Sequence, residues 1–227
     1  MRLTCLAAVA LLAPAFAVAA PPVNCGTITQ PGSYTLTRNL SSTGDCIVVA
    51  SDFVTIDLAG FTISGADNPQ SAGIREGSGG TAPGFRGVVI RNGNIVHFGQ
   101  GIAFDLSPGV TIEHVNASQN VFNGVTLLGN TSVVRSSRFD NNGGNGIQVE
   151  FNSVLTGNIA IGNGNNGFFA SEGSLIVNNQ ATGNAAAGIA MDCPSAAIAN
   201  STNENVAGPN LEQINAGSCL VDRNLVF

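Results

Sequence analysis

The sequence contains no lysine and no tryptophan, one tyrosine and two histidines. All eight basic residues are arginine, against 14 carboxylates, and charged residues make up only 10% of the chain. A protein that binds nucleic acid or an anionic membrane surface needs a basic patch. This charge balance argues against both kinds of partner.

Long apolar runs are also scarce, and the main one lies at the N-terminus. Arg2 precedes the run "TCLAAVALLAPAF", and an "AVA" cleavage motif ends at Ala19. The run is too short to span a membrane and no stop-transfer segment follows it, so residues 1–20 are predicted to be a signal peptide cleaved near Ala19. We expect a secreted or periplasmic mature chain (21–227) without membrane insertion. Its net charge is near −7, because seven arginines remain against 14 carboxylates.

Glycine and asparagine are abundant instead, and they recur with a period. A glycine followed by an apolar residue recurs about every 22 residues, at Gly101, Gly124, Gly146, Gly167 and Gly188. Paired apolar residues repeat at similar steps from Val89-Ile90 to Leu220-Val221. An asparagine column shares this period, at Asn120, Asn142, Asn163, Asn184 and Asn205. Three registers with one period indicate a structural repeat.

Within each repeat the segments are short and alternate, as in "VTIEHV" and "GIQVEF", with no sustained helical stripe. A period of about 21–23 residues made of short strands describes one rung of a parallel β-helix. We therefore predict an all-β chain forming a single parallel β-helix of about eight rungs. Its core ladders are expected at Ile102, Val125, Ile147, Phe168 and Ile189, and beside them at Phe104, Leu127, Val149, Ala170 and Met191.

The first rungs fit the same scheme with one interruption. Ile56 and Ile90 lie about one and a half periods apart, so we predict a loop at 66–87, where glycine, proline and serine gather. The mature chain retains four cysteines. Cys25 and Cys46 lie one period apart, whereas Cys193 and Cys219 are separated by slightly more than one period. Disulfides Cys25–Cys46 and Cys193–Cys219 would staple the two ends of the solenoid.

The opening "CGTITQPGSYTLTRNLSSTGDCIVVASDFVTIDLAGFTISG" (residues 25–65) resembles that of exported bacterial right-handed parallel β-helix repeat proteins of the pectate-lyase-like superfamily. The asparagine-rich repeats after Val88 are similar to the repeat region of that family. The resemblance implies a right-handed solenoid and export. Relatives include polysaccharide lyases, epimerases and hydrolases, so the resemblance points to polysaccharide without specifying a reaction.

The asparagine column and the glycine-rich clusters both have simple structural interpretations. Asparagines stacked at a corner of each rung would bond to the backbone there. The clusters "NNGGNG" (141–146) and "GNGNNG" (162–167) superficially resemble calcium-binding loops. Calcium in such loops needs a carboxylate in each repeat, which these clusters lack. We predict no metal and no cofactor.

A charged column is the more informative feature. Asp57, Arg91, Glu113 and Arg135 each follow the paired apolar step, and Thr156 continues the column. An exposed ionic ladder that satisfies itself is the simpler interpretation. The alternative is a groove in which Arg91 and Arg135 bind a uronate carboxylate.

Further polar residues near this column are expected to share a face with it. The candidate ligand-facing set comprises Arg91, Glu113, Arg135, Arg138, Asp140 and Glu150. His97 and His114 lie nearby in the sequence without metal-ligand spacing, and a plain surface role is the simpler interpretation for both.

The chemistry known on this scaffold narrows the function only partly. Calcium-dependent pectate lyases need clustered aspartates, whereas the acidic residues here are scattered. Polygalacturonase-like hydrolysis needs paired aspartates and an Arg-x-Lys motif, and the chain has neither Asp-Asp nor lysine. A site that uses tyrosine would have only Tyr34. Two functions remain: contact with an extracellular polysaccharide, with or without lyase- or epimerase-like turnover, or a non-catalytic surface or scaffold solenoid. The oligomeric state is left open.

Overall fold

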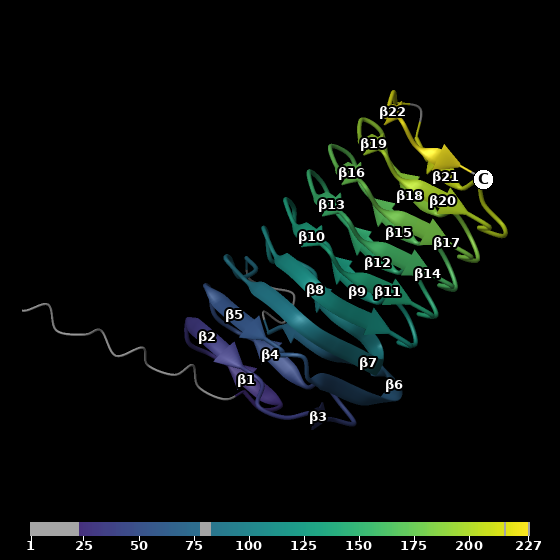
Figure 1. Ribbon diagram of the computed structural model, residues 1–227. Helices are drawn as coiled ribbons and strands as arrows, with labels where there is room; N and C mark the ends of the chain where they lie inside the picture. The colour runs from purple at the N-terminus through teal and green to yellow at the C-terminus, as the bar shows by residue number, and fades with distance from the viewer. Residues whose placement is uncertain (1–22, 78–82, 216, 227) are drawn as a thin grey trace, which may run out of the picture.

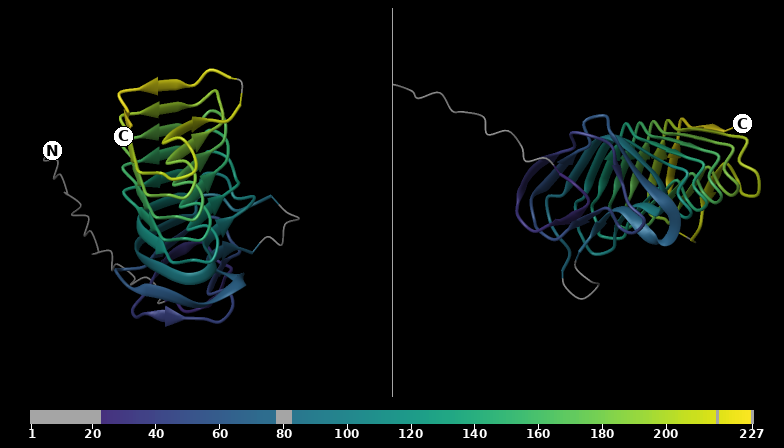
Figure 2. Two further views of the ribbon diagram at one scale, coloured as in Figure 1. Left: turned by 90° about the vertical axis from the view of Figure 1, so that its right-hand side faces the viewer. Right: turned by 90° about the horizontal axis from the view of Figure 1, so that it is seen from below.

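The computed structural model describes residues 23–77, 83–215 and 217–226. The chain winds into a solenoid whose rungs stack along one axis, with β1–β3 at one end and β21–β23 at the other (Figures 1 and 2). This part of the chain forms nine rungs and contains no helix, so the predicted all-β, right-handed parallel β-helix is confirmed with one rung more than expected.

Each rung contributes one strand segment to each of three faces, named here A, B and C in chain order. Face A consists of β1 (Gly26–Ile28), β4 (Ile47–Val49), the end of β6 (Thr62–Glu76), the end of β7 (Val89–Phe104), β9 (Val125–Leu127), β12 (Ile147–Val149), β15 (Phe168–Ala170), β18 (Ile189–Met191) and β21 (Leu211–Gln213).

Face B consists of β2 (Gly32–Thr35), β5 (Val54–Asp57), the start of β7, the start of β8 (Thr111–Ser118), β10 (Val133–Arg135), β13 (Val154–Thr156), β16 (Leu175–Val177), β19 (Ala196–Ile198) and β22 (Leu220–Asp222). Face C consists of β3 (Leu40–Ser41), the start of β6, the middle of β7, the end of β8, β11 (Arg138–Asp140), β14 (Ile159–Ile161), β17 (Gln180–Thr182), β20 (Ser201–Asn203) and β23 (Leu225–Val226).

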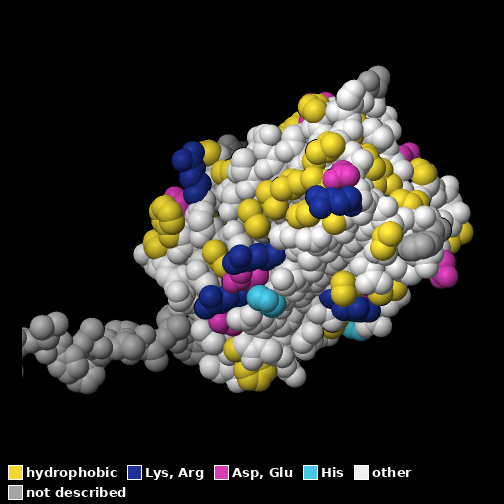
Figure 3. Space-filling view, turned by 45° about the horizontal axis from the view of Figure 1, so that its top comes forward, with side chains coloured by type: hydrophobic (Ala, Val, Ile, Leu, Met, Phe, Trp, Pro, Cys, Tyr) yellow, Lys and Arg dark blue, Asp and Glu magenta, His cyan; other side chains and the backbone are white. Residues whose placement is uncertain are grey.

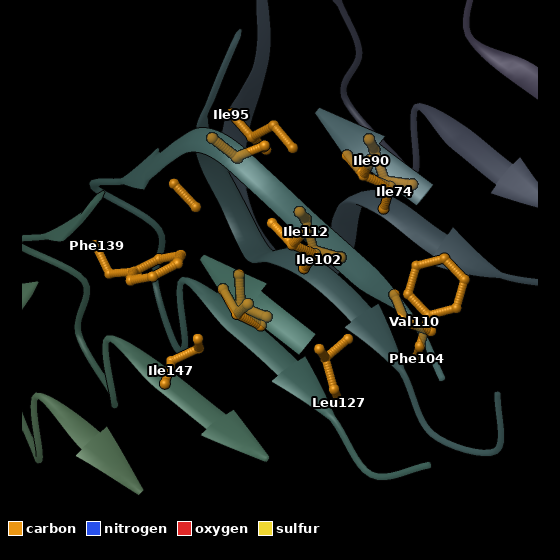
Figure 4. Close-up of a cluster of buried hydrophobic side chains, with 14 of the residues drawn as sticks. Ile74, Ile90, Ile95, Ile102, Phe104, Val110, Ile112, Leu127, Phe139 and Ile147 are labelled. Carbon is orange, nitrogen blue, oxygen red and sulfur yellow. The ribbon is translucent and has the colours of Figure 1, made fainter. Parts of the chain in front are cut away.

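The predicted core ladders are confirmed. All ten residues of the two ladders are completely buried, and their register runs from Ile102 through Ile147 to Ile189. Figure 4 shows several of these side chains, among them Ile102, Leu127 and Ile147, on the inner side of neighbouring strands. Because the side chains of a strand alternate, the outward residues of each segment lie between the buried ones. The apolar surface removed from water in these ladders stabilises the stack.

The asparagine column turns each rung from face C into face A, as the simpler interpretation predicted. Asn142 Nδ2 donates to the Ala117 carbonyl at 3.0 Å and to Asn163 Oδ1 at 3.0 Å, while Asn142 Oδ1 accepts from the backbone N–H of Asn120 at 3.1 Å. The column also explains the recurring glycine. A Cβ on Gly146 would lie 2.6 Å from the Gly167 carbonyl oxygen and 2.9 Å from Asn163 Nδ2.

The two other corners carry ladders that the sequence reasoning missed. Between faces B and C, Asn158, Asn179, Asn200 and Asn224 repeat the same amide bonding. Between faces A and B, the hydroxyls of Ser153, Ser174 and Ser195 accept the backbone N–H of the serine one rung earlier, beginning with Ser132. Both columns follow the common period and are visible in the sequence once that period is known.

The prediction of a loop at 66–87 is wrong for residues 66–76, which belong to a strand. β6 continues to Glu76 and pairs with β7, with register shifts between Ser64 and Asn68 and between Asn68 and Ala72. The polar residues that suggested a loop are accommodated by bulges in this long strand, because a bulge adds residues to one strand without ending the pairing. Residues 78–82 of the predicted loop lie outside the described residues, as does the predicted signal peptide at 1–20.

Both predicted disulfides are present, Cys25–Cys46 near the first rung and Cys193–Cys219 near the last. Disulfides persist in oxidising compartments, so the pair indicates an extracellular or periplasmic setting. Within the described ranges there is no helix with the length and apolarity needed to cross a membrane.

Candidate functional site

The charged column on face B has the register expected from the sequence. Asp57, Arg91, Glu113 and Arg135 lie on successive rungs. Arg91 Nε lies 3.0 Å from Asp57 Oδ2, and Arg135 pairs with Glu113 through both Nε and Nη2. The column is therefore two ion pairs on successive rungs. Arg135 uses two of its nitrogens for Glu113, whereas Arg91 is paired with Asp57 through Nε alone.

Asp57 is held in its charged form. Burial raises the pKa of Asp57, but the backbone N–H of Ala59, the Asn92 amide and the Arg91 guanidinium lower it by more, so the pKa lies below its ordinary value of 3.8. A carboxylate of this kind has no proton to donate and is a weaker base than an ordinary aspartate. Face B near Asp57 thus has the electrostatics of a structural ion pair.

A groove lies at the corner between faces B and C, next to these pairs. It has a volume of about 410 Å³, and its lining spans four successive rungs. The lining includes Gly60, Gly93, Asn94, His114, Asn116, Ser136 and Arg138. His114 has a φ of 54° and turns the corner in the left-handed region, which leaves its side chain exposed on the rim.

Gly93 lies beside the groove, at the inward corner position that Val115 occupies one rung later. A Cβ at this position would lie 2.4 Å from Leu58 Cβ and 2.7 Å from the Phe61 carbonyl oxygen, so only glycine fits the backbone here. Gly60, one rung earlier, has a φ of 83° and faces open space. At the outward corner position, Asn92, His114 and Ser136 follow one another on successive rungs, and all three have a positive φ.

The face C side of the groove is a stack of polar side chains. Asn94, Asn116 and Arg138 lie at one register position on successive rungs. Asn94 Nδ2 donates to Thr62 Oγ1 at 3.4 Å. Asn116 Oδ1 is buried and has no hydrogen-bond partner among the described residues. An unpaired buried acceptor costs about 1–3 kcal/mol unless something donates to it.

Arg138 and Asp140 form an ion pair along β11 that involves Arg138 Nε and Asp140 Oδ2. Asp140 is 8% exposed, and within the described residues its other oxygen, Oδ1, has no hydrogen-bond partner. Burial raises the pKa of Asp140 above its ordinary value of 3.8, although Arg138 acts in the opposite direction. The pair thus combines a cation on the groove with a buried carboxyl group that takes up a proton more readily than usual.

The remaining predicted residues lie elsewhere. Glu150 follows β12, at the corner between faces A and B, so the expectation that it shares a face with Arg138 is wrong. His97 lies at the corner between faces C and A, where its Nδ1 is 3.2 Å from Asp67 Oδ1. Sequence reasoning missed Asn94 and Asn116, although they lie one period apart in the sequence.

A buried carboxylate inside the solenoid has a structural role. Glu76 occupies an inward position of face A, where it accepts hydrogen bonds from Ser107 Oγ at 2.6 Å and from the Leu106 backbone at 3.0 Å. These bonds hold the residues that follow β7. No group of three or more His, Cys, Asp or Glu residues in the described ranges is placed to hold a metal ion.

Comparisons with known proteins agree with this architecture. The family model described as "Right handed beta helix region" matches residues 31–202. The A-module of Azotobacter vinelandii mannuronan C-5 epimerase AlgE4 is similar with a TM-score of 0.60 and 17% identity, over 88% of this chain and 68% of that one. The AlgE6 A-module gives a TM-score of 0.57 and 14% identity, over 85% and 68%. No curated protein is similar enough in sequence to count as a relative. At these identities, the likeness to the solved structures concerns the fold alone.

Proposed function

The chain belongs to the right-handed β-helix family, and from that premise we propose that it binds an acidic extracellular polysaccharide in the groove between faces B and C. The observation that carries this proposal is the alignment of Asn94, Asn116 and Arg138 on successive rungs, with His114 on the opposite rim. The mannuronan epimerases with the same fold make a uronic-acid polymer the first candidate.

The groove suits an extended polymer that runs along the solenoid axis. Rungs repeat about every 4.8 Å, so Asn94, Asn116 and Arg138 present polar groups at regular intervals to successive sugar units. Only Nε of Arg138 is paired, and its terminal guanidinium nitrogens have no protein partner in the described ranges. These nitrogens are suited to a carboxylate, which guanidinium binds through paired hydrogen bonds.

The groove offers a local cation, Arg138, whereas Arg38 and Arg86 are exposed without an ion-pair partner elsewhere on the described surface. The chain carries a net charge of −6, so a polyanion is repelled at long range. Arg91, Arg135 and Arg75 are paired with carboxylates. Arg138 also has a carboxylate partner, but this partner is the buried Asp140, whose raised pKa favours its neutral form. A proton on Asp140 would release Arg138 for a ligand.

We propose that the protein is exported, with residues 1–20 as a cleaved signal peptide followed by one β-helix domain. The two disulfides support an oxidising compartment. Mass spectrometry of the mature N-terminus would test this. A chain that still starts at Met1 after secretion would contradict cleavage near Ala19.

Binding is tested with oligomers of mannuronate and a neutral oligosaccharide by titration calorimetry. Arg138→Ala should weaken binding of the uronate about 10- to 100-fold, because a hydrogen bond between charged groups contributes about 1.5–3 kcal/mol. Arg223→Ala is the matched control, because Arg223 is also exposed and also paired with an aspartate, but lies on the last rung. Equal losses in both variants would contradict a site in the groove.

Protonation of Asp140 supplies a second readout. The raised pKa means that Asp140 becomes neutral as the pH falls through a value above 3.8, and uronate binding should strengthen in that window. Asp140→Asn mimics the neutral form, so it should bind more tightly at pH 7 and lose this pH dependence.

The same samples separate binding from turnover. Ultraviolet absorbance reports unsaturated products of a lyase, and proton NMR reports epimerised sugar units. The ion pairs on face B, which satisfy themselves, favour the second candidate, a non-catalytic scaffold solenoid. That candidate is preferred if neither uronate nor neutral glycans bind.

A further inference from the structure

The groove between faces B and C carries little charge of its own. Among the eight residues that line it, with histidine neutral at pH 7, Arg138 is the one charged residue. On the face B side, Asp57 is paired with Arg91. Glu113 is paired with Arg135, so these two pairs add no net charge. In Figure 3, most basic side chains lie beside an acidic one, and no continuous basic strip crosses the face in view. The groove therefore offers a cation to one anionic group at a time.

This cation lies at one end of a polar series on face C. Asn94, Asn116 and Arg138 occupy one register position on three successive rungs. Ile159 takes the same position on the next rung, so the polar series ends at Arg138. At about 4.8 Å per rung, the three positions span about 10 Å along the axis. A ligand unit at Arg138 thus has its neighbours at two neutral amides.

The two amides suit hydroxyl groups better than carboxylates. An amide side chain both donates and accepts hydrogen bonds, and so does a sugar hydroxyl, whereas an ionised carboxylate only accepts. Asn94 Nδ2 already donates to Thr62 Oγ1. Asn116 Oδ1 is an acceptor without a donor among the described residues, and a carboxylate cannot supply one. A hydroxyl group is therefore the better match at both positions.

We propose that the groove selects an acidic polysaccharide in which single uronate units are separated by neutral sugar units, in preference to a polymer of uronates alone. This inference rests on the proposed binding function of the groove and adds the spacing of charge along the ligand. Arg138 binds the uronate carboxylate, and Asn94 and Asn116 bind hydroxyl groups of two neutral units. Three consecutive uronates would bring two more carboxylates without a cation, to a chain whose net charge is already −6.

Titration calorimetry at pH 7 with five trisaccharides measures this preference. Three of them carry a single uronate, at the first, middle or last unit, the fourth has three uronates and the fifth has none. A trisaccharide with its uronate at one end should bind most tightly, because Arg138 lies at one end of the polar series. The all-uronate trisaccharide should bind about 3- to 30-fold more weakly, because each uncompensated charge at an exposed site has a small electrostatic cost. Raising the ionic strength should narrow this difference, since salt screens exposed charges.

A second cation in the polar series should remove the preference. Asn116→Arg places a guanidinium one rung from Arg138, so the affinity for the all-uronate trisaccharide should rise about 10-fold relative to the best single-uronate one. Gln180→Arg is the matched control, because Gln180 is exposed and occupies the same register position two rungs beyond Arg138, outside the groove. This control should keep the wild-type order of affinities. Circular dichroism checks that both variants fold, and the wild-type series decides by itself if Asn116→Arg does not.

The outcomes separate this inference from the proposed function. Failure of every uronate trisaccharide to bind overturns both. If the all-uronate trisaccharide binds at least as tightly as every single-uronate isomer, the charge spacing is overturned and a uronate site in the groove stands. A folded Asn116→Arg variant that keeps the wild-type order of affinities also overturns the charge spacing.

Discussion

The rungs before Asn120 and the rungs after it form the same corners with different chemistry. Between faces B and C, the corner residue is Val115 on the fourth rung, then Ser137, then Asn158 and its repeats. Between faces A and B, Val88 and Val110 precede the serine ladder. The early rungs bury apolar corners, whereas the late rungs bury hydrogen-bonded ones.

The outward side chains show the opposite trend. Face B carries the ion pair Asp57–Arg91 on early rungs, the pair Glu113–Arg135 across the divide, and apolar residues such as Val154 and Leu175 on late rungs. The regular spacing of the late rungs accounts for their hydrogen-bonded corners. An amide ladder needs the same corner geometry on consecutive rungs, which the constant step of the late rungs provides. The register shifts in β6 break this regularity at the corner between faces C and A on the early rungs.

The proposed groove lies where the amide ladder between faces B and C is missing. Gly93 and His114 occupy corner positions on early rungs, where no ladder of amides fills the corner. Residues released from bonding their neighbours are available to a ligand. The groove therefore lies at the boundary of the two regions, with Gly93 and His114 on early rungs and Arg138 on the first late rung.

The largest expected effect comes from breaking a polar corner. Asn158→Ala removes hydrogen bonds to the Val134 carbonyl and Asn179, and leaves the Ser137 N–H unpaired. We expect it to lower the free energy of unfolding by about 3–5 kcal/mol. Val115→Ala, in the same column, should cost about 2 kcal/mol through lost apolar contact. Chemical denaturation measures both, and an equal cost would remove the proposed distinction between the two kinds of corner.

Removing either disulfide tests whether the two ends of the solenoid unfold independently. They close loops of 21 and 26 residues, so each is expected to contribute about 3 kcal/mol. Replacing Cys193 and Cys219 by serine should let β21–β23 exchange amide hydrogens while the early rungs stay protected. Replacing Cys25 and Cys46 should leave β21–β23 unaffected. Uniform loss of protection in either variant would mean that the solenoid unfolds as one unit.

The glycine column tests how tightly the late rungs are packed. Gly146→Ala introduces a Cβ 2.6 Å from the Gly167 carbonyl oxygen, so a shift of the backbone is required. We expect a loss of about 1–3 kcal/mol. Gly44→Ala is a suitable control, because a Cβ there would meet nothing within 4 Å. Thermal unfolding followed by circular dichroism should separate the two variants.

The smallest expected effect concerns the ion pairs of the early rungs. The pKa of Asp57 is lower in the folded protein than its ordinary value of 3.8. Its stabilising contribution is therefore complete above pH 3.8 and is lost as the pH falls through the lower folded value. Asp57→Asn should remove this pH-dependent part, which is under about 1 kcal/mol because the pair is partly exposed and screened. Denaturation at pH 7 and pH 3 measures it, and a difference that grows at pH 3 would contradict the sign.

Sequence reasoning worked where one residue type recurs at a regular step. The core ladders, the column of Asn142 and both disulfides followed from the period, because neighbours along the solenoid axis are one period apart. It failed at β6, where polar residues suggested a loop and bulges kept the strand paired. It also placed Glu150 on the wrong face, because the period does not show where a rung turns its corner.

The sequence alone therefore determined the repeat, the axial neighbours and the buried ladders of this protein, since these depend on spacing along the chain. Only the tertiary structure decided which outward residues meet across a corner. Non-glycine residues in the left-handed region, such as His114, turn the corners, and spacing does not reveal them. That geometry brings His114 and Arg138 to one groove. Side chains far apart in a rung become neighbours only when the rung closes around its core.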